Sequence, residues 1–201
     1  MADKRARTEL ARAAFALKAQ SGARLPALVL MTDDARLADP VAAVRALPQG
    51  SMVILRARND RVRARLAKEL RPLTRARRIK LLIANDAELA ARIGADGIHL
   101  SEALARQAAH WRACHPRWII TTAAHTLAAT RDPHADALML APVFATQSHP
   151  GGKYLGAILA RLIAQQAHAP LYALGGIEAK TARHLSGAKF IGLAAIGGLA
   201  V

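Results

Sequence analysis

The chain is poor in cysteine, in aromatic residues and in acidic residues, and each shortage excludes classes of protein. Cys114 is the single cysteine among 201 residues, so an internal disulfide is impossible, which is typical of the reducing cytoplasm. No apolar run is long enough to span a bilayer, and the N-terminus lacks the apolar core of a secretory signal. We therefore expect a cytoplasmic protein without a membrane partner.

Aromatic residues make up 3% of the chain, while Lys and Arg number 29 against 14 Asp and Glu, for a net charge of +15. Such an excess favours anionic partners, either nucleic acid or a small anion held in a basic surface. Few aromatic side chains are present to stack on bases. The basic residues are spread over predicted helices, apart from a denser cluster between 61 and 80. We expect a small phosphate-bearing ligand rather than nucleic acid.

Eight short apolar runs predict eight strands. Most of them are continuously apolar rather than alternating, which is typical of parallel strands buried on both faces. The chain is 53% hydrophobic and long enough for one domain with a sizeable core. The predicted strands are 27–32, 52–56, 79–84, 97–100, 118–122, 137–141, 171–174 and 190–194.

Helical patterns lie between these runs. Asp39-Pro40 is an N-cap followed by proline at the first helical position. The segment 61–75 has Val62, Leu66 and Leu70 at helical spacing. A strand every roughly 25 residues predicts a (β/α)8 TIM barrel. A doubly wound open sheet is the alternative.

The two ends of the chain depart from that plan. Only residues 196–201 follow the eighth strand, too few for a closing helix, whereas 4–20 form a helical pattern before the first strand. We predict that residues 1–24 form a helical extension that packs on a barrel of residues 25–201 and covers the seam between its last and first strands. Leu10 and Leu17 should then be buried. The alternative is a surface appendage or an oligomer contact, and an oligomer is left open.

Two glycine-containing segments point to a ligand. Gly94 to Leu100 reads GADGIHL, and Leu174 to Ile177 reads LGGI. Glycine lets backbone N–H groups approach an anion closely, and a following helix would add partial positive charge. A glycine-rich turn after a late barrel strand therefore predicts a phosphate site at Gly175 and Gly176.

Polar side chains at the predicted carboxyl ends of other strands are further candidates. Arg56 ends an apolar strand and needs an anionic partner, either a ligand phosphate or Asp33 or Asp86. Asp86 is either a ligand for a hard cation such as magnesium or simply a helix N-cap. His99 is expected to be a hydrogen-bonded core histidine. His125, in a polar loop, is the better acid–base candidate.

Six segments, in order along the chain, resemble the thiamine phosphate synthase and TenI superfamily. They are 30–33 (LMTD), 55–56 (LR), 82–86 (LIAND), 94–100 (GADGIHL), 141–146 (APVFAT) and 174–177 (LGGI). The resemblance covers nearly the whole chain, from about residue 27 to 195. It implies a TIM barrel that takes phosphate-bearing small molecules.

The resemblance also implies roles for individual residues. A thiazole phosphate would be held by backbone groups at Gly175, Gly176, Ala194 and Ala195. An aminopyrimidine diphosphate would be held on the other side, with Asp86 as a magnesium ligand. The substrate-binding and diphosphate-binding residues that it implies are Arg56, Arg58, Asn85, Thr146, Ser148 and His149.

The diphosphate side departs from the family pattern. The departures are Ile54 for a glutamine, Arg58 for a lysine, Ser101-Glu102 for Gly-Gln, Leu104 for the second magnesium aspartate, Ala123 for a serine and His149 for a lysine. Leaving diphosphate needs its growing charge neutralised, and these changes remove much of that provision. Magnesium is therefore expected only if synthase activity is retained.

The better-matched phosphate side resembles the TenI branch, some of whose members move a proton on a carboxythiazole phosphate. His125 falls on the histidine given that proton transfer. We expect a thiamine-biosynthesis or salvage protein, TenI-like rather than a full synthase. The alternatives are a divergent thiamine phosphate synthase, which is a transferase, and a non-catalytic sensor of a phosphate ligand.

Overall fold

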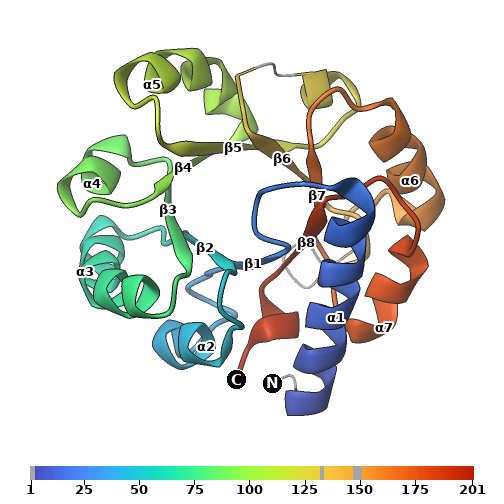
Figure 1. The fold of residues 1–201 in the computed structure, drawn as a ribbon, viewed down its shortest axis with the longest axis horizontal. Helices are drawn as coiled ribbons and strands as arrows, with labels where there is room; N and C mark the ends of the chain where they lie inside the picture. The colour runs from blue at the N-terminus through green and yellow to red at the C-terminus, as the bar shows by residue number, and fades with distance from the viewer. Residues whose placement is uncertain (1–2, 132–133, 147–150) are drawn as a thin grey trace.

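A computed structural model describes residues 3–131, 134–146 and 151–201. Within these residues, eight parallel strands form a closed barrel in sequence order (Figure 1). The strands are β1 (Leu28–Met31), β2 (Met52–Leu55), β3 (Lys80–Ala84), β4 (Gly97–Leu100), β5 (Ile119–Ala124), β6 (Ala137–Leu140), β7 (Leu171–Ala173) and β8 (Gly192–Ala195). All eight predicted runs contain a strand. The open-sheet alternative is wrong, because β1 pairs with β8.

Helices surround the barrel. The α-helices are α1 (Lys4–Ser21), α2 (Pro40–Ala46), α3 (Asp60–Ala76), α4 (Ala87–Arg92), α5 (Ala108–Cys114), α6 (Gly156–Gln166) and α7 (Ala179–Ala182). Short 3-10 helices are η1 (Glu102–Gln107), η2 (Ala128–Arg131), η3 (Arg183–Leu185) and η4 (Gly197–Leu199). None of the helices in the described ranges is long and apolar enough to cross a membrane.

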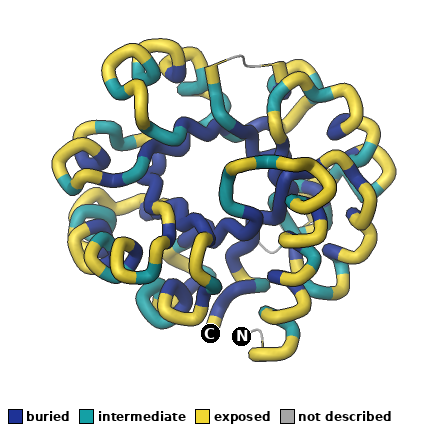
Figure 2. Tube along the Cα trace, in the orientation of Figure 1, coloured by how far each residue is buried: buried dark blue, intermediate teal, exposed yellow. Residues whose placement is uncertain are grey.

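The core consists of the strands and the faces of the helices that cover them (Figure 2). Every residue of β1, β2, β4, β6, β7 and β8 is buried. This explains their continuous apolar sequences, because a barrel strand has side chains facing both the interior and the helices. Helix α3 shows the complementary pattern: Leu66 and Leu70 are buried on one side, and the Asn59 side chain caps its first turn.

Helix α1 lies over the seam of the barrel, in the place of a helix after β8 (Figure 1). It packs against α7, β8 and β1. Leu10 is 0% and Leu17 is 3% exposed. The Asp3 side chain caps its start, and Gly22, with a left-handed φ of 65°, ends it. The boundary at residue 24 between an extension and a barrel domain stays a prediction.

Candidate active site at the carboxyl end of the barrel

His125 follows β5 at the carboxyl end of the barrel, where sites of this fold collect. Its ring Nδ1 lies 2.7 Å from the carbonyl oxygen of Ala141, and its backbone N–H donates to Glu102 Oε2 at 2.8 Å. A carbonyl oxygen can only accept, so Nδ1 carries the proton in this contact. In the neutral ring, Nε2 then carries the lone pair, which is the arrangement a general base needs.

The ends of β6 and β7 lie against each other beside His125. Ala141, its hydrogen-bond partner, directly precedes Pro142. A Cβ built on Gly175, whose φ is 93°, would lie 2.8 Å from the Cα of Pro142. Val143 N–H also donates to the Leu174 carbonyl at 2.9 Å. Only glycine permits this close approach, so a run of direct contacts joins the imidazole to the glycine turn.

Gly176, with φ of 63°, continues this turn, and a Cβ on it would lie 2.4 Å from the Ala145 carbonyl oxygen. The N–H groups of Gly175 and Gly176 donate no hydrogen bond within the described residues. Such donors are suited to the oxygens of a phosphate. Helix α7 (Ala179–Ala182) follows this turn, as expected, and the contribution of its N-terminus to phosphate binding stays a prediction.

Ala194 and Ala195 lie inside β8, paired with Val29 and Leu30 of β1, and are buried. The loop after them carries two more N–H groups without an acceptor in the described residues, those of Gly197 and Gly198. A Cβ on Gly198 would lie 2.5 Å from the Ile177 carbonyl, so this loop abuts the glycine turn. The sequence does not distinguish these two glycines, because the short Gly-Gly pair there matches no motif.

Arg56 directly follows β2, which β1 alone separates from β8 in the ring of strands. Its guanidinium contacts the Asp33 carboxylate, which also accepts from Arg36 Nη2 at 3.0 Å. The hydrogen bonds from Arg36, opposed by burial and assisted by Arg56, hold the pKa of Asp33 well below its usual range. Of the two carboxylates considered as partners for Arg56, the structure selects Asp33, and a ligand phosphate as a further partner stays a prediction. The Arg56 side chain remains 45% exposed, so it can also reach a ligand.

Arg58 is exposed and lies beside Asp33 and Asp34. Its backbone N–H donates to Asp34 Oδ2 at 2.8 Å. Together with Asp33, Ala35 and Arg56, these two residues line a pocket at the ends of β1 and β2. Arg56 and Arg58 therefore line the same pocket, and the ligand expected for them stays a prediction.

Asp86 is fully engaged by protein partners. Its Oδ1 accepts the Leu89 N–H at 2.9 Å and caps α4, while Oδ2 accepts from Arg63 Nη2 at 2.9 Å. The N-cap interpretation is confirmed. The preceding residue, Asn85, is exposed and has a left-handed φ of 54°. Its side-chain oxygen accepts the Ser101 N–H at 2.8 Å.

These contacts do not fit a protein-held magnesium ion. Each oxygen of Asp86 already has a donor, one of them the Arg63 guanidinium. Residue 104 is an apolar leucine, and no group of three potential metal ligands occurs in the described part of the chain. Arg63 supplies positive charge where the resemblance would place the cation. The sequence places Arg63 in the basic cluster between 61 and 80, and nothing in its spacing shows that it reaches the end of the next strand.

His99 is buried within β4, and its Nδ1 lies 3.0 Å from Thr121 Oγ1. Burial, with a smaller effect of the Arg56 charge, lowers its pKa to about 4. This neutral histidine agrees with the core interpretation. Thr146 is partly buried at the end of the described β6–α6 segment. Ser148 and His149 lie outside the described residues, so their predicted roles stay predictions.

Comparison with known proteins agrees with this architecture. A sequence model of the thiamine monophosphate synthase family matches residues 27–199. The chain belongs to this family. The match covers all eight strands and both glycine turns, and the TenI branch falls in the same superfamily. The family assignment made from the six motifs is therefore confirmed.

Individual proteins with similar sequences also carry thiamine-phosphate synthase names. The chain is 35% identical over 131 residues to "Putative thiamine-phosphate synthase 2" of Aquifex aeolicus, covering 63% of this chain and 70% of that protein. It is 32% identical over 132 residues to the thiamine-phosphate synthase of Pasteurella multocida, covering 63% of this chain and 59% of that one. The alignment thus spans somewhat more than half of the Pasteurella protein.

A solved structure from the family superimposes well. The thiamine phosphate pyrophosphorylase of Pyrococcus furiosus has a TM-score of 0.69 and 25% identity, with 84% of each chain covered. The similarity therefore extends over most of the family barrel.

Proposed function

We propose that this member of the family binds a thiazole phosphate and moves a proton on its ring, as a TenI-like thiazole tautomerase. The phosphate is held by the amides of Gly175 and Gly176 and those of Gly197 and Gly198. Ala194 and Ala195, buried in β8, set the position of the second loop. His125 takes a proton from one ring position and returns it to another, so no net proton is lost.

The observation that carries this proposal is the contact run from His125 through Ala141-Pro142 to Gly175. It supports a role for His125 as a base, because the Ala141 carbonyl holds Nδ1 and the unpaired amides of Gly175 and Gly176 lie nearby. An imidazole can accept and donate a proton near neutral pH. Phosphate binding at the amides would orient the ring toward this base.

The segments after β2 and β3 support the choice of a tautomerase over a synthase. There, Arg56 contacts Asp33 and Arg63 contacts Asp86, so much of the charge is balanced within the protein. Releasing diphosphate needs positive charge that is free to meet the growing negative charge. With Asp86 occupied and Leu104 apolar, no step of the proposed reaction passes through magnesium.

A thiamine phosphate synthase is the second candidate, favoured by the names of the relatives in Aquifex and Pasteurella and by the exposed Arg56 and Arg58. In this reaction the two arginines, with Asn85 and Thr146, would bind the aminopyrimidine diphosphate. Ser148 and His149 would contribute from the following loop. Guanidinium groups would then supply the charge that magnesium supplies in the pattern implied by the family resemblance.

The deciding experiment measures both reactions with the purified full chain. We expect isomerisation of a carboxythiazole phosphate, insensitive to EDTA, and no thiamine phosphate from the two synthase substrates. His125→Ala and His125→Asn should each lower the isomerisation rate by about 10²–10⁴-fold, since neither side chain can act as the base. Asparagine can still donate to Ala141, so a defect in both variants separates proton transfer from positioning.

His168→Ala is the matched control, because His168 is exposed before β7, at the other end of the barrel. It should leave the rate unchanged. Magnesium-dependent formation of thiamine phosphate would establish the second candidate instead. Tight thiazole phosphate binding without either reaction would identify a sensor. A phosphate found away from Gly176 in a crystal soaked with the ligand would contradict the proposed site.

A further inference from the structure

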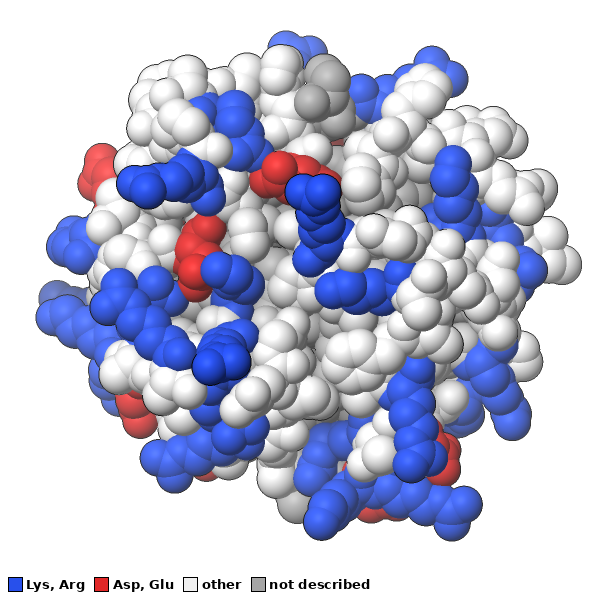
Figure 3. All heavy atoms as spheres, viewed as in Figure 1, with Lys and Arg blue, Asp and Glu red and all other residues white. Residues whose placement is uncertain are grey.

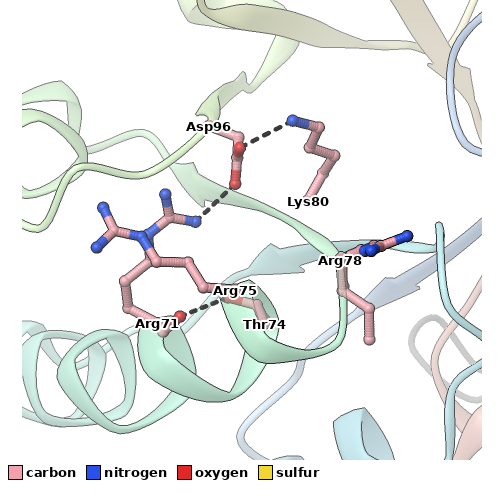
Figure 4. Close-up of a pocket in the computed structure, with 7 residues that line it drawn as sticks. Arg71, Thr74, Arg75, Arg78, Lys80 and Asp96 are labelled. Carbon is pink, nitrogen blue, oxygen red and sulfur yellow. Dashed lines mark hydrogen bonds and ion pairs between the residues drawn. The ribbon is translucent and has the colours of Figure 1, made fainter.

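A hollow lined largely by basic side chains lies at the other end of the barrel from the candidate active site. Its walls are the end of α3, the start of β3 and the loop before β4 (Figure 4). The lining residues are Arg71, Thr74, Arg75, Arg78, Ile79, Lys80 and Asp96. Four of these residues are cationic and one is acidic, so positive charge exceeds negative charge by three.

Asp96 organises one side of the hollow. Its carboxylate accepts from Arg71 Nη1 at 2.7 Å and from Lys80 Nζ at 3.1 Å, as Figure 4 shows. These ion pairs fix two cationic side chains at the wall. The Nε atom of Arg71 is buried and has no hydrogen-bond partner within the described residues. An unpaired buried donor on a guanidinium is costly.

Arg75 and Arg78 supply the charge that Asp96 leaves unbalanced. Both side chains are exposed, and in the described part of the chain neither guanidinium has a hydrogen bond or ion pair. Arg75 extends over Gly94, where a Cβ would lie 3.2 Å from its Nη2. In Figure 4 the guanidiniums of Arg71 and Arg75 lie together on one side, whereas the Arg78 side chain leaves the end of α3 on the other side and points away from them.

Arg78 occupies a backbone position that favours glycine. Helix α3 ends in a Schellman motif, in which Arg78 N–H donates to Arg75 at 3.1 Å and Ile79 N–H donates to Thr74 at 2.8 Å. The motif needs a left-handed residue, and Arg78 has φ of 53°. Helix α4 ends with the same pair of hydrogen bonds and uses Gly94, with φ of 61°.

This contrast within one chain indicates a role for the Arg78 side chain. A residue with a Cβ is disfavoured in the left-handed conformation, so glycine would suit the end of α3 better. Strain that persists at one position is a reason to look for a function there. The side chain at this position is a cation, and it lines a hollow that already has an excess of positive charge.

We propose that this hollow binds a compact anion with two or more phosphate groups, either inorganic diphosphate or the phosphate chain of a nucleotide. A phosphate monoester carries about −1.5 to −2 charges, less than the excess of three. Guanidinium groups bind phosphate oxygens in pairs of hydrogen bonds. The lining residues include no aromatic side chain, so the phosphate groups rather than a base are recognised. This proposal is independent of the reaction at the other end of the barrel.

The test is a titration of the full chain with inorganic diphosphate and, separately, with ADP, both without magnesium, followed by backbone amide NMR. Site-resolved signals are needed because Arg56 and Arg58 can bind the same anions. We expect the amides of residues 74–81 and 94–96 to shift with both ligands. Tighter binding of one ligand identifies the source of the phosphate chain.

Arg78→Gly separates binding from folding. We expect it to weaken binding at these amides by about tenfold, the effect of roughly one charge-assisted hydrogen bond. Because glycine suits the position, the midpoint of thermal unfolding should stay equal or rise. Arg75→Gln should also weaken binding, without depending on the backbone argument. Arg65→Gln is the matched control, since Arg65 is exposed on the same helix outside the hollow.

Two results would overturn the proposal. One is the absence of shifts at residues 74–81 and 94–96 while the amides near Arg56 do shift. The other is an equal loss of affinity in Arg65→Gln and Arg78→Gly, together with tighter binding of a short single-stranded RNA than of diphosphate. That outcome would identify α3 as an extended surface for polynucleotides.

Discussion

At the scale of single residues, two histidines at neighbouring strands have opposite environments. His125 is exposed and held by the Ala141 carbonyl, whereas His99 is buried next to Thr121. The sequence separated them correctly, because His99 lies inside a continuous apolar run and His125 follows one. The partner atoms belong to Thr121 of β5 and to Ala141, directly after β6, 22 and 16 residues away, and no local pattern reveals them.

Burial of His99 predicts a pH dependence of stability. Its pKa in the folded protein is lowered to about 4, below the unfolded value of about 6.5. Between these values the unfolded state binds the additional proton, so the free energy of unfolding falls as pH decreases from about 6.5 to about 4. We expect His99→Gln, which cannot take up this proton, to lose less stability over that window.

Urea unfolding at a series of pH values measures this effect. Between pH 6.5 and pH 4, the parent protein should lose on the order of 2–3 kcal/mol more free energy of unfolding than His99→Gln. An identical pH dependence in both proteins would contradict a neutral, buried His99. The carboxylate of Asp33, whose pKa is lowered, acts in another window: its contribution is present above about pH 3.9 and is lost in stronger acid.

At the scale of elements, the position of α1 decides how the barrel closes. A helix after β8 would start at the carboxyl end and cover β8 and β1. Helix α1 covers the same strands by entering from the other direction of the chain. Leu10 approaches Gly198, where a Cβ would lie 3.3 Å from its side chain, so this helix also supports the loop after β8.

Leu10→Ala should therefore destabilise the fold. Leu10 is 0% exposed, and removing such a side chain leaves a cavity, with a loss of about 2–5 kcal/mol in the free energy of unfolding. Arg12→Ala, at an exposed position of the same helix, is the control and should change it by less than about 0.5 kcal/mol. Chemical denaturation measures both. Similar small losses in the two variants would show that α1 is not part of the cooperative core.

At the scale of the whole molecule, the excess of basic residues is distributed over the surface and gathers over α3 in the view of Figure 3. Several of the few acidic residues are used inside the protein. Asp33, Asp86, Asp96 and Asp136 each contact an arginine or lysine across elements. The remaining positive charges repel one another, which favours anionic ligands and opposes compactness.

Screening that repulsion should stabilise the fold. Chloride salt raised from about 0.01 M to about 0.15 M shortens the screening distance from about 30 Å to about 8 Å. With a net charge of +15, we expect the midpoint of thermal unfolding to rise. Calorimetry in a buffer without phosphate measures it, since phosphate would also bind. A lower midpoint at high salt would mean that the cross-element ion pairs outweigh the repulsion.

The sequence by itself determined the barrel and the family. Strand runs, helical spacing and glycine turns are local patterns, and each follows from burial or backbone freedom within a few residues. Counting those units predicted eight strands and favoured a barrel over an open sheet, the pairing of β1 with β8 in the structure decided the closure, and six short motifs were enough to indicate the superfamily.

Only the tertiary structure decided the electrostatic partners. Arg63 meets Asp86, Arg36 and Arg56 share Asp33, and Arg78 stands in a glycine position beside a hollow. The pairs Arg63–Asp86 and Arg56–Asp33 join side chains 23 residues apart that the curvature of the barrel brings together. Long flexible cations can reach several carboxylates, so sequence spacing does not select among them; packing does.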